Sequence, residues 1–222
     1  MSAHLSGYLA AYLYLFGVIL AVTLLQKVTG MNTEYSRKLI HILIGATWLI
    51  LYHFFWPSPQ ILIVPFSFII INALSYRFGL FSAIERTGDS ENHLGTVYFS
   101  IGITALLACA LLWPDTVMIS GMAVTCLCFG DGFAAICGTM AKHPIPLTKG
   151  KSLQGTLGCI AATLAGLLLF SAVMDFSISL PALLLLSAAT GLLELVGHGL
   201  DNFSIIFGCY GLGCALLALG VL

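Results

Sequence analysis

Two lysines and a serine, in the run Lys149-Gly150-Lys151-Ser152, stand just before an apolar segment that starts at Gly155. If that segment is a helix, its first turn exposes unpaired backbone N–H groups and the positive end of the helix dipole, which together attract anions. A glycine there also lets a phosphate approach the backbone closely. No Gly-x-x-x-x-Gly-Lys run precedes it, so this is not a Walker loop. The segment therefore predicts phosphate binding by Lys142, Lys149, Lys151, Ser152 and Gly155.

Carboxylates form the second group of candidate residues. Asp131 lies between two glycines, Gly130 and Gly132, inside an apolar run, and Glu194 ends another run, with Asp201 soon after it. A carboxylate inside a membrane costs about 2.5–3.5 kcal/mol, so it needs a partner or a function. A hard cation such as Mg²⁺ prefers oxygen ligands and phosphates. We therefore expect Asp131, Glu194 and Asp201 to hold Mg²⁺.

A network of mutually paired charges is an alternative explanation for the same carboxylates, for example a pair between Arg37 and Glu194. Arg37, Lys38 and His41 open an apolar run, and Arg37 and His41 are four residues apart on one helical face. We expect these three side chains to complete a clamp of positive charge or to orient the reacting group. Asp131 is the first candidate for a general base, and His41 is the second.

The elements that must position these residues are transmembrane helices. Of the 222 residues, 59% are hydrophobic and only 8% are charged, whereas a soluble domain has about 25% charged residues. A membrane-spanning helix needs about 20 apolar residues. Eight runs come near that length: 8–25, 39–56, 61–76, 95–113, 117–141, 155–174, 180–196 and 203–222. The sequence thus predicts an all-α bundle of about eight transmembrane helices with short outer loops, forming a single catalytic domain over residues 1–222.

The charges also predict an orientation. All eight basic residues lie in or beside alternate connections between the runs, and basic residues near helix ends favour the cytoplasm. We therefore expect the candidate site to face the cytoplasm and both termini to lie outside. A net charge of −1 gives no reason to expect a nucleic acid partner.

Carboxylates for a metal and a basic helix start for phosphate, in a membrane bundle, point to phosphoryl or nucleotidyl transfer. In such reactions the protein mainly positions the reactants and neutralises charge. A lipid hydroxyl would approach within the membrane and a nucleotide from the cytosol.

The sequence resembles the polyprenol kinase family, which includes dolichol kinases, phytol kinases and CTP-dependent diacylglycerol kinases. The resemblance implies transfer of the γ-phosphate of CTP, with Mg²⁺, to a membrane isoprenoid alcohol of the polyprenol, dolichol or phytol type, or to diacylglycerol. It also implies that Asp131, Gly130 and the lysine segment lie at the CTP and metal site, with Lys38 among the nucleotide contacts. The matching residues are Ser36-Arg37-Lys38-x-x-His41, Gly95-Thr96-x-Tyr98, Gly130-Asp131-Gly132-x-Ala134-Ala135-x-x-Gly138, Lys149-x-Lys151-Ser152-x-x-Gly155, Glu194, Asp201 and Asn202.

Two other functions remain open. A CTP:phospholipid cytidylyltransferase has a similar arrangement of acid, glycine and lysine around its metal, but it releases pyrophosphate instead of phosphorylating a lipid. A transporter could use the polar residues as an ion path, although transporters often contain internal repeats and none is evident here. The sequence does not identify the lipid or the oligomeric state.

Overall fold

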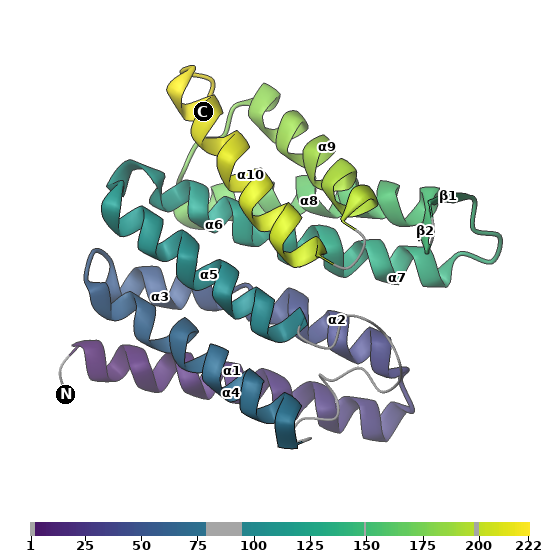
Figure 1. Ribbon diagram of the computed structural model, residues 1–222, viewed down its shortest axis with the longest axis horizontal. Coiled ribbons are helices and arrows are strands. Elements are labelled where there is room, and N and C mark those ends of the chain that lie inside the picture. Colours follow the sequence, from purple (N-terminus) through teal and green to yellow (C-terminus); the bar gives the residue numbers. More distant parts are fainter. Residues whose placement is uncertain (1–2, 79–94, 149, 198–199) are drawn as a thin grey trace. The chain divides into compact units, whose positions relative to one another are not determined.

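The computed structural model describes residues 3–78, 95–148, 150–197 and 200–222. Within these residues the chain is almost wholly helical, which confirms the all-α prediction (Figure 1). Seven stretches are long and apolar enough to cross a membrane, and an eighth helix in the described part, Leu180–Val196, is shorter. The chain divides into two compact units, Met1–Pro114 and Asp115–Leu222. The single catalytic domain expected from the sequence stays a prediction.

The first unit contains five α-helices among its described residues. The predicted run 39–56 starts earlier than expected and is split. Asn32 caps its first helix by accepting a hydrogen bond from the backbone N–H of Glu34, and that helix ends at Gly45. Short i→i+3 hydrogen bonds then link it to the next helix, as in Trp48 N–H to Gly45 O at 3.1 Å. The helices are α1 (Ala3–Thr29), α2 (Thr33–Ile44), α3 (Thr47–Phe55), α4 (Ile63–Phe78, preceded by a 3₁₀ turn Pro59–Leu62) and α5 (Gly95–Leu112).

The second unit holds most of the predicted site. Its helix α8 packs against α7, α9 and a π-helical segment, and α10 packs against α6 and α9. A two-stranded hairpin lies at the end of α7 and the start of α8 (Figure 1). The elements are α6 (Val117–Thr125), the π-helical segment Cys126–Asp131, α7 (Gly132–Met140), β1 (Pro146–Thr148), β2 (Lys151–Ser152), α8 (Leu153–Met174), α9 (Leu180–Val196) and α10 (Asp201–Ala218).

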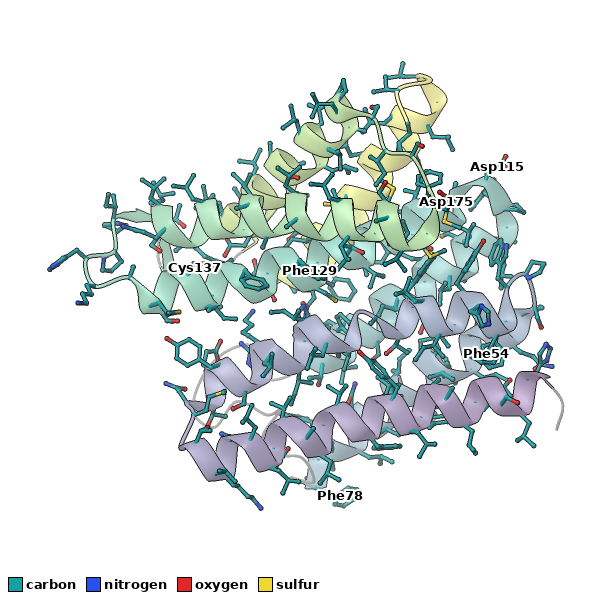
Figure 2. All side chains as sticks on the ribbon, turned by 180° about the vertical axis from the view of Figure 1, so that it is seen from behind. Phe54, Phe78, Asp115, Phe129, Cys137 and Asp175 are labelled. Atoms are coloured by element: carbon teal, nitrogen blue, oxygen red, sulfur yellow. The ribbon has the colours of Figure 1, made fainter. Side chains whose placement is uncertain are left out.

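Glycines on α8 allow it to lie close to the chain before the hairpin. A Cβ on Gly158 would stand 2.5 Å from Cys137 Sγ, and one on Gly166 would stand 2.8 Å from Phe129 Cγ. Figure 2 labels Cys137 and Phe129 where they meet this helix. Between lipid-facing helices there is no hydrophobic driving force, so close backbone packing through small residues holds such helices together.

Candidate functional site

The lysine segment forms the short hairpin β1–β2, which the sequence analysis did not predict. Thr148 pairs with Lys151 and Pro146 with Ser152 in antiparallel register. Gly150 has a φ of +79°, a left-handed conformation that glycine adopts without steric cost. The turn therefore requires a glycine at this position, and it brings Lys151 back to the beginning of α8. Lys149 lies outside the described residues.

Ser152 is the N-cap of α8. Its side-chain oxygen accepts a hydrogen bond from the backbone N–H of Gly155 at 3.2 Å, which satisfies one of the free N–H groups of the first turn. The sequence analysis placed a helix start here, and the structure confirms it. Lys151 directly precedes this N-cap, at the end of α8 where the helix dipole is positive.

Lys151 is the centre of an ion-pair cluster that joins strand β2 to helices α9 and α10. Its ammonium group donates to Glu194 Oε1 at 2.5 Å and to Asp201 Oδ2 at 3.2 Å. These partners are 43 and 50 residues away along the chain. Each carboxylate uses one oxygen for Lys151, whereas the buried Glu194 Oε2 and Asp201 Oδ1 have no hydrogen-bond partner among the residues that the structure describes. We call Lys151, Glu194 and Asp201 the Lys151 cluster.

Lys151 stays positively charged in this setting. Burial on its own would lower the pKa of Lys151. The hydrogen bond to Glu194 and the negative charges of Asp201 and Glu194 outweigh burial and raise that pKa above the ordinary lysine value. A lysine with this pKa is fully protonated at neutral pH. With one positive and two negative side chains, the Lys151 cluster has a net charge of about −1.

Asp131 is the last residue of the π-helical segment and is buried, with 6% of its surface exposed. Single π-helical turns occur often at functional sites because the extra residue re-aims the side chains that follow. Asp131 belongs to the same unit as the Lys151 cluster. That they act together in one site stays a prediction.

Two glycines predicted to contact a nucleotide have a packing role in the structure. A Cβ on Gly130 would stand 2.5 Å from Thr190 Cγ2, and one on Gly155 would stand 2.9 Å from the carbonyl oxygen of Ala134. Both glycines therefore allow helices to approach closely. Their contacts with a nucleotide remain predictions.

The carboxylates suit a hard cation by their chemistry. Among the described residues, Glu194 Oε2 and Asp201 Oδ1 have no hydrogen-bond partner, and they are oxygen ligands of the kind that Mg²⁺ prefers. No three His, Cys, Asp or Glu side chains in the described part of the chain are arranged as a metal site. The magnesium site of Asp131, Glu194 and Asp201 stays a prediction.

Three predicted site residues lie on α2 in the first unit. Arg37 pairs with Glu34 at 2.5 Å, one helical turn before it. Lys38 is buried, and the His41 ring lies 4.8 Å from that of Phe99. Arg37 has a carboxylate partner on its own helix and Glu194 pairs with Lys151. The suggested pair between Arg37 and Glu194 stays a prediction. The roles of Arg37, Lys38 and His41 in the reaction stay predictions, as does that of Lys142, which is exposed.

Gly197 shapes the Lys151 cluster although no sequence signal singled it out. A Cβ there would stand 2.0 Å from Asp201 Oδ1 and 2.9 Å from Ser204 Oγ. Since Gly197 has an ordinary φ of −67°, only the steric clash opposes a larger residue. We expect Gly197→Ala to displace Asp201 and to lower the free energy of unfolding by about 1–3 kcal/mol, the usual cost of overpacking. Thermal unfolding of the purified protein would measure this change.

The matched control is Gly211→Ala on α10, where an added Cβ would meet nothing within 4 Å. Alanine favours a helix over glycine by about 1 kcal/mol, so this control should be neutral or stabilising. Equal unfolding midpoints for the two variants would show that Asp201 is not held against Gly197.

Comparison with known proteins found several relatives. The chain is 26% identical over 213 residues to a protein named phytol kinase from Synechocystis sp., with 92% of this chain and 87% of that protein covered. It is 28% identical over 178 residues to a probable chloroplastic phytol kinase 1 of Glycine max, covering 72% of this chain and 58% of the relative. A probable chloroplastic phytol kinase 2 of Oryza sativa is 31% identical over 149 residues, which cover 60% of this chain and 45% of the relative. No family model and no solved structure matched.

Proposed function

We propose that the chain phosphorylates a lipid alcohol in the membrane, because the relatives it resembles are named as phytol kinases. The donor we propose is CTP with Mg²⁺, and the acceptor is an isoprenoid alcohol. Phytol is the first acceptor to test, because it is the substrate named for the relatives. The observation that carries the proposal is the Lys151 cluster, where a charged lysine, a helix start and two open carboxylate oxygens meet.

The Lys151 cluster supplies what phosphoryl transfer needs. The transferred phosphoryl group passes through a loose transition state whose negative charge must be neutralised. Lys151 lies in β2, immediately before Ser152, the N-cap of α8. Its ammonium group and the positive end of the helix dipole could therefore act on the same phosphate. To reach a phosphate, Lys151 must give up at least part of its contact with Glu194 and Asp201.

The carboxylates have complementary roles. When bound, Mg²⁺ would be held by Glu194 and Asp201 and would supply further positive charge to the phosphates. Without added positive charge, a cluster of net charge about −1 would repel a nucleotide triphosphate. Asp131 is the candidate that accepts the proton of the lipid hydroxyl as the phosphoryl group is transferred. Because the transition state is loose, a strongly basic acceptor is not required.

The membrane determines how the two substrates would arrive. We propose that the lipid alcohol reaches the site between helices, since the chain has seven helices long and apolar enough to span a bilayer among its described residues. The nucleotide would enter from the cytosol, on the side that the basic residues favour. With the shorter helix Leu180–Val196 as an eighth crossing, both termini would then lie outside.

A donor and acceptor screen tests this function directly. The purified protein in lipid vesicles is incubated with Mg²⁺ and γ-labelled CTP, ATP, GTP or UTP, together with phytol, a polyprenol or diacylglycerol. Label recovered in a phosphorylated lipid, with CTP as the best donor, is the expected result. Label in pyrophosphate after addition of phosphatidate would instead indicate a cytidylyltransferase. Turnover with ATP but not with CTP would overturn the choice of donor.

A further inference from the structure

Gln154, in the first turn of α8, holds the segment that leads into the hairpin. Its side-chain oxygen accepts from the backbone N–H of Ile145 at 3.0 Å, and its side-chain N–H donates to the carbonyl of His143 at 3.1 Å. Both ends of one amide group are therefore bound to the same stretch of backbone. The glutamine amide carries a neutral donor and a neutral acceptor on one planar group, whereas an ionised glutamate offers acceptors alone.

The sequence around Ile145 makes this contact specific. Ile145 stands between Pro144 and Pro146, and proline has no backbone N–H. Ile145 thus carries the one backbone N–H of residues 144–146, and the side-chain oxygen of Gln154 accepts a hydrogen bond from it. The carbonyl of Ile145 accepts from the backbone N–H of Leu153 at 2.8 Å. Both the N–H and the carbonyl of Ile145 are thus hydrogen-bonded to the first turn of α8, which fixes the base of the hairpin there.

The other attachments of the hairpin are at its tip and are of a different kind. Thr148 donates to the carbonyl of Leu195 on α9 at 3.4 Å, a long and weak hydrogen bond. The strong contact there is the ion pairing of Lys151 with Glu194 and Asp201. If Lys151 turns to a phosphate, it leaves these partners, and the hairpin then depends on its base.

We propose that Gln154 is a positioning residue, which keeps the base of the hairpin on α8 so that Lys151 can exchange its carboxylates for a nucleotide phosphate. The inference rests on the proposed function. Gln154 does not touch the reacting atoms and acts only through the place it gives to Lys151. The two hydrogen bonds of the Gln154 amide determine how firmly the base of the hairpin, and with it Lys151, is held in position.

The test is Gln154→Met, which keeps the length of the side chain and removes both hydrogen bonds. We expect the KM for the nucleotide to rise about tenfold, the factor that loss of 1–2 kcal/mol of positioning gives. The KM for the lipid alcohol should not change. A variant that was only less stable would lose active enzyme and lower the apparent kcat, without changing the KM for one substrate. Gln154→Glu, which keeps the acceptor for Ile145, should lie between the wild type and Gln154→Met.

A second measurement does not need activity. Amide hydrogen exchange of the segment 143–148 should be faster in Gln154→Met, because the Ile145 N–H loses its acceptor, and should be unchanged in the other helices. The matched control is Gln26→Met, which removes a single side-chain hydrogen bond to Thr33 in the first unit. The control should change neither the exchange of this segment nor the KM for the nucleotide.

The two measurements separate the inference from the function on which it rests. Unchanged exchange in Gln154→Met would overturn the inference, as would faster exchange with an unchanged KM for the nucleotide. If the wild type transfers no phosphoryl group from any donor, the proposed function fails, and the positioning role falls with it. The exchange result would in that case still show whether Gln154 holds the hairpin.

Discussion

Replacing Lys151 by methionine is expected to reduce phosphoryl transfer to lipid by about 100- to 1000-fold, the usual effect of removing one group that stabilises charge in the transition state. Lys151 lies in β2, just before α8. Its raised pKa keeps the side chain positively charged. Methionine retains the apolar stem and removes the ammonium group. Initial rates with labelled nucleotide and a saturating lipid alcohol would measure the loss.

Two further variants decide whether the charge itself matters. Lys27→Met makes the same substitution at the exposed end of α1, away from the Lys151 cluster in sequence. We expect near-normal activity from this variant. Removing one partner of a fully buried ion pair destabilises a fold by about 3–5 kcal/mol, because the other charge is left unpaired. The cost here should be smaller, since the Lys151 side chain is 18% exposed. The double variant Lys151→Met, Glu194→Gln removes the unpaired charge of Glu194.

If Lys151→Met keeps its thermal unfolding midpoint but loses activity, the ammonium group of Lys151 takes part in the reaction. The double variant tests stability only, because Glu194 is itself a proposed Mg²⁺ ligand. Equal activities for Lys151→Met and Lys27→Met would indicate that Lys151 contributes to membrane orientation and not to the reaction.

Asp131→Asn is expected to reduce turnover by about 100- to 10,000-fold, the range found when a group that accepts a proton is lost. Asparagine has the shape of aspartate without its charge. Because a charge buried within the membrane is energetically costly, its removal should not destabilise the fold. The protein should therefore remain folded and inserted in the membrane. The measurements are the rate of lipid phosphorylation and the thermal unfolding midpoint of the same preparation.

Asp175→Asn provides the matched control at the far end of α8 (Figure 2). Asp175 has a φ of 48°, a conformation in which asparagine is readily accommodated. We expect normal activity and stability from this variant. An active Asp131→Asn enzyme would remove the carboxylate from both the metal site and proton transfer, leaving His41 as the next candidate base.

Local features of the chain were enough to predict the class of fold. Apolar runs of about 20 residues form helices in a membrane because every backbone polar group must be paired within its own segment. For that reason α5 lies close to its predicted range, from Gly95 to Leu112. The split between α2 and α3 and the π-helical segment Cys126–Asp131 were not predicted, because they disturb the helix without interrupting its hydrophobicity.

The candidate site was predicted less evenly. Ser152 was identified as part of a helix start because capping depends on neighbouring residues. The structural role of Gln154 was not predicted, because it depends on a hydrogen bond from the backbone N–H of Ile145, nine residues earlier in the chain. Gly155 was assigned to phosphate, whereas its surroundings show that it also permits close contact with α7. A glycine that allows two helices to pack and a glycine that admits a ligand leave the same signal in a sequence.

By itself, the sequence determined that this is a helical membrane protein with its charged residues concentrated in a few connections, because hydrophobic length and helix capping are local properties. The pair of Arg37 with Glu34 lies within one helix and is local as well. Only the tertiary structure decided that Lys151 meets Glu194 and Asp201, which are 43 and 50 residues away along the chain. A buried charge must be paired, but its partner depends on which helices pack together, and packing is decided by side chains distributed along the whole unit.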